Sequence, residues 1–132
     1  MMYLDANFFI FALLDKTKKG DTARSIQRQI QEGKKPACTS ALALDEVMWV
    51  LIKNKRRNLL RKAIEGIYSL NNLKIGEVSS MIPLRALDFM DAYSLKPRDA
   101  FHLAVMDELD IAEIVSNDSD FDKIKYIHRI NF

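Results

Sequence analysis

The chain opens with MYLDANFFIFALL at residues 2–14, where a short apolar run ends at an acid and a longer apolar segment follows. The run Met2 to Leu4 has the length and composition of a buried strand. The segment Asn7 to Leu14 is apolar on nearly every side, which predicts a buried helix. Asp5 therefore stands where a strand ends and a helix is about to begin.

Short strands and longer helices alternate along the rest of the chain, with no repeat and no long linker. The later strands are expected at Pro36 to Thr39, Lys74 to Val78, Ile111 to Ser116 and Tyr126 to Ile130. The later helices are expected at Thr22 to Glu32, from the Ser40 cap to Ile52, Leu59 to Leu70, from Pro83 onward, and Arg98 to Leu109. Strands separated by helices imply a mainly parallel sheet covered on both faces. We therefore expect one three-layer α/β/α domain, residues 1–132, with a five-stranded sheet.

Some apolar side chains are expected in the core because they fit the inner faces of these elements. In the helix opened by Pro83 we expect four residues to face inward, namely Leu84, Leu87, Phe89 and Met90. Trp49 is interpreted as a core residue, and so is Cys38 within its predicted strand.

Composition limits the class of protein further. Hydrophobic residues make up 48% and charged residues 29%, with four Gly and three Pro, which excludes a disordered or low-complexity chain. Cys38 is the only cysteine, so it cannot form an internal disulfide, and we expect a reducing compartment, the cytoplasm. The apolar run Phe8 to Leu14 is far shorter than the roughly 20 residues of a membrane span. It also lacks the flanking features of a signal peptide.

Charge is distributed unevenly along the chain, although the net charge is only +2. Residues 1–62 hold 13 Lys and Arg against 6 Asp and Glu, whereas residues 63–132 hold 7 against 12. The densest basic cluster contains Lys53, Lys55, Arg56, Arg57, Arg61 and Lys62. Such a cluster suits a surface that follows an RNA backbone. A solvated junction between two helices explains the same residues, and the sequence leaves both interpretations open.

Acidic residues recur where the predicted strands end. Asp5 ends the first strand, Glu46 lies in the helix after the second, Asp99 opens the Pro97 helix, and Asp118 and Asp120 follow the fourth strand. The carboxyl ends of parallel strands share one edge of a sheet, where ligands of open α/β sheets bind. Carboxylates gathered there repel one another and raise each other's pKa unless a cation holds them. An all-oxygen set suits Mg²⁺ or Mn²⁺.

Most of these acids also have a purely structural explanation. Asp5 can cap a helix, Asp99 can favour a helix N-terminus, and Asp118 with Asp120 can form an Asx turn. Glu46 serves no helix end and lies next to Asp45 within an otherwise apolar helix. Taken together, the acids favour a metal site over separate structural roles.

Four motifs then carry a resemblance to a known family. They are Leu4-Asp5-Ala6-Asn7, the Ser40 helix bearing Glu46, Pro97-Arg98-Asp99-Ala100-Phe101-His102-Leu103-Ala104, and Ser116-Asn117-Asp118-Ser119-Asp120-Phe121. In this order and over the whole chain they resemble the PIN-domain family, in particular the small toxins of VapBC toxin–antitoxin pairs.

The resemblance implies a metal-dependent endoribonuclease whose first and fourth strands lie side by side. The family's four acids fall on Asp5, Glu46, Asp99 and Asp118, with Mg²⁺ or Mn²⁺ as cofactor. Its supporting polar positions fall on Asn7, Ser116 and Asp120, where Ser116 replaces the usual Thr and keeps the hydroxyl. The resemblance also implies a small antitoxin protein as partner and a homodimer.

Two other functions compete with the nuclease. A phosphatase of the haloacid dehalogenase type also begins with a strand and Asp-x-Asp, but Asn7 replaces the second Asp and cannot transfer a proton. A domain that binds RNA or protein without catalysis has no physical need for several repelling carboxylates. His102, three residues after Asp99, is interpreted as a packed or surface histidine.

Overall fold

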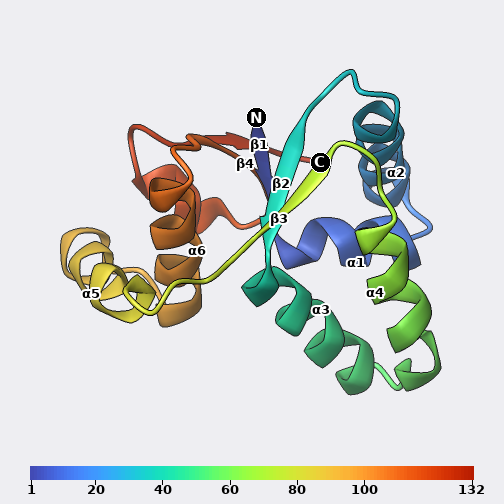
Figure 1. Cartoon of the computed structure of the whole chain (residues 1–132), viewed down its shortest axis with the longest axis horizontal. Coiled ribbons are helices and arrows are strands. Elements are labelled where there is room, and N and C mark those ends of the chain that lie inside the picture. Colours follow the sequence, from blue (N-terminus) through green and yellow to red (C-terminus); the bar gives the residue numbers. More distant parts are fainter.

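Five parallel strands form a single sheet in the order β3-β2-β1-β4-β5 in the computed structural model, which describes all residues, 1–132 (Figure 1). The strands are β1 Met2–Leu4, β2 Ala37–Ser40, β3 Leu73–Gly76, β4 Glu113–Val115 and β5 His128–Ile130. The chain builds outward from β1 to β3 and then returns to place β4 on the other side of β1. The strand order therefore reverses between β1 and β4, which the resemblance had placed side by side, and ligands of such sheets bind at this position.

Six α-helices connect the strands. They are α1 Ala6–Leu14, α2 Lys18–Gln31, α3 Ala41–Lys53, α4 Leu60–Tyr68, α5 Ile82–Tyr93 and α6 Pro97–Glu108, with short 3₁₀ turns at Arg57–Leu59 and Ser119–Lys123. Each expected element exists, with ends shifted by a few residues. The largest shift is in α2, which begins four residues earlier than expected because the Thr17 side chain accepts a hydrogen bond from the Lys19 amide and caps it. Gly33, with φ of 78°, follows the end of this helix.

The sheet is covered on both faces, as the expected three-layer architecture requires. Leu4 and Val115 belong to the core that packs against α1 to α4, whereas Tyr3 and Ile114 belong to the core under α5 and α6. Figure 1 shows α5 and α6 on one side of the strands and α1, α2 and α4 on the other. This alternation follows from the period of two along a strand.

Three side chains expected in the core are exposed instead. Leu84 and Leu87 of α5 are 59% and 54% exposed, and the inward face of the helix is formed by Ile82 and Ala86. These two buried residues are four apart, which sets the buried stripe on a different side of the helix from the one predicted. Trp49 is also exposed, because α3 packs through one side only.

Other expectations for the core are confirmed. Phe89 and Met90 pack against the core under α5 and α6, and Cys38 is fully buried. None of the helices combines the length and the apolar character that crossing a membrane requires.

Candidate functional site

Three carboxylates converge beyond the carboxyl end of β4. Asp99 lies in the first turn of α6, and Asp118 and Asp120 lie in the segment after β4, with one oxygen of each within 4.8 Å of the others. The only ion pair among them joins Asp120 to Lys123 at 3.5 Å. Burial and the neighbouring charge of Asp118 raise the pKa of Asp99 to about 6. The group therefore holds more negative charge than its surroundings neutralise.

The segment after β4 is shaped by its own hydrogen bonds. The Asp118 amide donates to the buried Ser116 hydroxyl at 3.0 Å, and the Asp120 amide donates to Asp118 Oδ1 at 2.9 Å. Asp118 therefore does form the Asx turn that was its structural explanation. The turn uses one of its two carboxylate oxygens, so the other remains available. Both polar side-chain atoms of Asn117 are shielded from solvent without a hydrogen-bond partner.

Asp5 lies beside this segment because β1 and β4 are neighbours. It is 6% exposed and caps α1 by accepting a hydrogen bond from the Phe8 amide at 3.1 Å. Burial raises its pKa to about 6, although the Ser116 hydroxyl and the Phe8 amide stabilise its charged form. A cap alone does not require a buried carboxylate, because exposed polar residues cap helices equally well.

Glu46 stands slightly apart from the three converging acids. Its Oε1 lies 2.5 Å from His102 Nε2 and 3.6 Å from Arg98 Nε. Both partners belong to α6, and His102 is one turn after Asp99, so Glu46 is tied to the helix that bears the cluster. The Glu46 charge is also one of the influences that raise the pKa of Asp5.

The structure shows two polar residues whose roles were not predicted. His102 is buried, as a packed histidine would be, but both ring nitrogens are hydrogen-bonded, with Nδ1 2.7 Å from Tyr3 Oη. Its spacing of three from Asp99 was the only available sequence signal. Tyr3 gave no signal because it occupies an apolar position of the first strand.

The remaining predicted residues are outside this cluster. Asn7 is exposed and makes no hydrogen bond to the acids. The predicted basic residues are exposed around the end of α3 and the start of α4, namely Lys53, Lys55, Arg56, Arg57, Arg61 and Lys62. Along α3, Lys53 lies roughly 10 Å from Glu46, at 1.5 Å per residue. Arg61 pairs with Glu65 at 3.2 Å, an exposed contact of little energetic weight.

The donor set fits a hard divalent cation. It consists of carboxylate oxygens without thiol or imidazole in the cluster, and its charge is largely uncompensated. Such a group can hold a metal ion and, with it, act on a phosphate ester.

Fold and site together define an α/β protein with converging carboxylates at the edge of the sheet where strand order reverses. The sequence profile of the PIN domain matches residues 2–126, and the chain belongs to this family. It is 28% identical over 138 residues to Ribonuclease VapC13 of Mycobacterium tuberculosis, covering 98% of this chain and 99% of that protein. The VapC ribonuclease Mb1869c of Mycobacterium bovis matches to the same extent.

Solved structures of low sequence identity share the fold. VapC20 of Mycobacterium tuberculosis, a Sarcin-Ricin loop cleaving toxin, gives a TM-score of 0.76 at 18% identity and covers 96% of this chain and 97% of that chain. VapBC2 from Rickettsia felis, bound to a DNA fragment from its promoter, gives a TM-score of 0.74 at 15% identity and covers 99% of this chain and 98% of that chain. A toxin–antitoxin complex from Klebsiella pneumoniae gives a TM-score of 0.67 at 22% identity and covers 96% of this chain and 95% of that chain.

Proposed function

We propose that this chain is a metal-dependent endoribonuclease and the toxin of a type II toxin–antitoxin pair. The observation that carries the proposal is the convergence of Asp99, Asp118 and Asp120 beside buried Asp5, where strand order reverses in a PIN domain. Two full-length relatives named as ribonucleases support the RNA substrate. A cytoplasmic location, expected from the single free cysteine, is part of the proposal.

Mg²⁺ or Mn²⁺ would be held by Asp5, Glu46, Asp99 and Asp118, with Asp120 in a supporting role beside Asp99 and Asp118. When bound, the ion would lower the pKa of a water molecule and offset the charge that develops on the phosphodiester. Ser116 positions the segment that bears Asp118. Asn7 is assigned a supporting role because it follows Asp5 at the exposed start of α1.

The basic residues at the α3–α4 corner are assigned to the RNA backbone. They are exposed, and most have no acidic partner, so they are free to contact phosphates. An extended strand of a few nucleotides is long enough to bridge the roughly 10 Å of α3 between Glu46 and Lys53. This surface gives affinity without base specificity.

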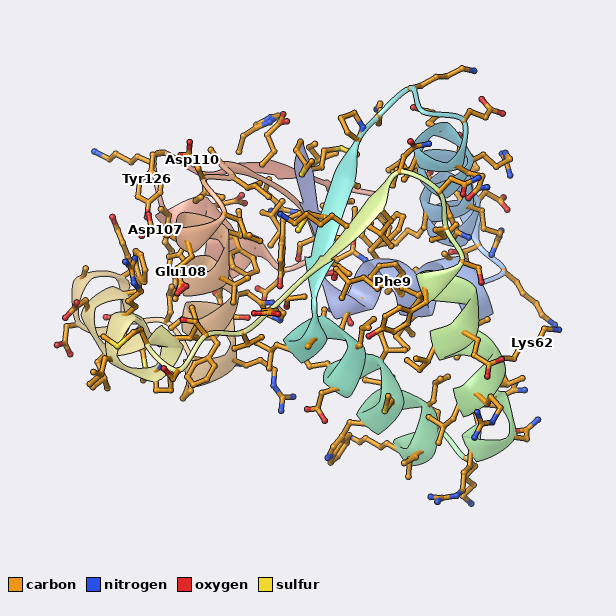
Figure 2. The ribbon with its side chains drawn as sticks, in the orientation of Figure 1. Phe9, Lys62, Asp107, Glu108, Asp110 and Tyr126 are labelled. Atoms are coloured by element: carbon orange, nitrogen blue, oxygen red, sulfur yellow. The ribbon has the colours of Figure 1, made fainter.

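A small antitoxin is proposed as the protein partner, because several proteins of this fold have been solved as toxin–antitoxin complexes. An apolar cavity of about 200 Å³ lies between α1 and α4 and is lined in part by Phe9, Leu13 and Ile67. Figure 2 shows Phe9 on α1 facing α4 and Lys62 at the outer side of α4. Apolar antitoxin side chains fit this cavity, and a basic one can neutralise the acids. The homodimer stays a prediction.

The test is cleavage of RNA by the purified chain with Mg²⁺ and with EDTA, for the wild type and Asp118→Asn. We expect cleavage only for the wild type with the metal, and no phosphate released from small phosphoesters. Cleavage that persists in EDTA or in the variant would exclude the metal site. Release of phosphate instead would favour the phosphatase, and RNA binding without cleavage would favour the non-catalytic domain.

A further inference from the structure

A continuous chain of buried polar side chains connects Glu46 to the centre of the sheet. The Ser40 Oγ lies 2.7 Å from Tyr3 Oη, which lies 2.7 Å from His102 Nδ1, and His102 Nε2 lies 2.5 Å from Glu46 Oε1. Tyr3 and Ser40 are fully buried and His102 is 2% exposed. Buried polar groups arranged in this way hold one another in fixed orientations.

The partners determine which atom donates each hydrogen bond. A Glu46 carboxylate can only accept, so His102 Nε2 must carry a proton. In a neutral imidazole Nδ1 then accepts, and the Tyr3 hydroxyl donates to it. Burial raises the pKa of Tyr3, which keeps this hydroxyl protonated. Ser40 in turn donates to Tyr3 and accepts from the Ala43 amide at 3.4 Å, so each group in the chain has a partner.

The geometry restricts Glu46 in a specific way. Both of its contacts use Oε1, which leaves Oε2 without a protein partner. The contact with Arg98 is long, and the Arg98 side chain is more than half exposed, so His102 provides the main restraint. Because His102 follows Asp99 by one turn of α6, its hydrogen bond holds the Glu46 carboxylate against the helix that bears Asp99.

We propose that His102 is a positioning residue that fixes the Glu46 carboxylate at the edge of the acidic cluster, and that Tyr3 fixes the tautomer of His102. The catalytic consequence rests on the proposed nuclease function. Partners of this kind typically change metal affinity or activity by 10–100-fold when removed. The relevant quantities are kcat and the affinity for Mn²⁺, whereas the KM for RNA depends on other surfaces.

The experiment compares His102→Leu, His102→Gln and Tyr3→Phe, with His128→Leu as a matched control at the exposed second histidine. His102→Leu is expected to lower kcat and Mn²⁺ affinity, measured by electron paramagnetic resonance without RNA, by roughly 10–100-fold. The KM for RNA should stay within about twofold of the wild type, because His102 is not part of the surface assigned to RNA binding. His102→Gln should recover most of the loss because its amide can still donate to Glu46. Tyr3→Phe should show a smaller loss of the same kind.

A double-mutant cycle separates positioning from general destabilisation. In a Glu46→Gln background, His102→Leu should have no further effect on Mn²⁺ affinity, because its partner is already altered. Equal effects in both backgrounds would overturn the inference, as would wild-type kcat and Mn²⁺ affinity in His102→Leu. If that variant does not fold, wild-type values in Tyr3→Phe would overturn it. If the wild type cleaves no RNA, the proposed function fails, and Mn²⁺ affinity alone still decides the positioning role.

Discussion

The two ends of α6 both carry acids, but their surroundings differ. At the C-terminal end Asp107 pairs with Arg85 at 2.9 Å, and Glu108 accepts a hydrogen bond from the Ser79 hydroxyl. Figure 2 shows Asp107 and Asp110 near Tyr126 at this end. At the N-terminal end Asp99 faces Asp118 and Asp120, and only Asp120 has a cationic partner. The two ends of α6 therefore differ in counter-charge and not in acidity, and the proposed metal site lies at the end where Asp99 and Asp118 have no cationic partner.

The largest expected effect tests the two ends directly. Asp99→Asn should reduce RNA cleavage at saturating Mg²⁺ by at least roughly 100-fold, because it removes a charged oxygen ligand. Asp107→Asn, the matched change at the other end, should stay within about twofold of the wild type. Initial rates on one RNA substrate measure both. Equal losses in the two variants would remove the distinction between the ends of α6.

A divalent cation should stabilise the fold by binding at the N-terminal end of α6 and not at its C-terminal end. Mn²⁺ at 100 times its dissociation constant is expected to add about 2.7 kcal/mol to the free energy of unfolding. This gain should vanish in Asp99→Asn and persist in Asp107→Asn. Thermal unfolding with and without Mn²⁺ measures it, and an undiminished gain in Asp99→Asn would place the ion elsewhere.

Without a divalent cation, stability should fall as pH rises from about 4 to about 6. The pKa values of Asp5 and Asp99 rise from 3.8 to about 6 on folding, so the folded state binds more protons in this window. Proton uptake on folding makes the free energy of unfolding decrease with pH. The shift at buried Asp5 corresponds to about 3 kcal/mol, and partly exposed Asp99 adds less because solvent screens its charge. Urea unfolding of the wild type and of Asp5→Asn/Asp99→Asn measures this. If the free energy of unfolding changed with pH equally in the wild type and in the double variant, the raised pKa values of Asp5 and Asp99 would be refuted.

The smallest effect concerns the basic α3–α4 corner, which should contribute to binding and not to chemistry. The double variant Arg56→Ala/Arg57→Ala should weaken RNA binding roughly 3–10-fold, with kcat unchanged. The slope of the logarithm of the binding constant against the logarithm of the salt concentration should become shallower by up to about 1.4. Lys34→Ala/Lys35→Ala is the charge-matched control, because these residues precede β2 at the opposite edge of the sheet. Equal loss in the two double variants would show that only net charge matters.

The sequence was sufficient to predict the architecture because each element had a local signal. Asp5 after an apolar run, the Ser40 cap and Pro97 at the start of a helix each fix a boundary through short-range chemistry. Parallel connectivity then placed the acids at one edge of the sheet. Their roles as ligands stay predictions, but the convergence of Asp99 with Asp118 and Asp120 is present in the structure.

Local sequence patterns did not predict the features that depend on tertiary packing. The exposure of Leu84, Leu87 and Trp49 depends on which neighbours α5 and α3 meet, and periodicity does not specify neighbours. The contacts of Tyr3 and His102 join residues 99 positions apart in the chain. No pattern within a strand or a helix predicts such a pair.

The most direct test of the metal site is anomalous diffraction from crystals of the wild-type chain soaked with Mn²⁺. We predict an anomalous peak within bonding distance of carboxylate oxygens of Asp99 and Asp118, at the N-terminal end of α6, and no peak beside Asp107. A map with no peak at Asp99 and Asp118 under saturating Mn²⁺, or with a peak only at the other end of the helix, would contradict the proposed function.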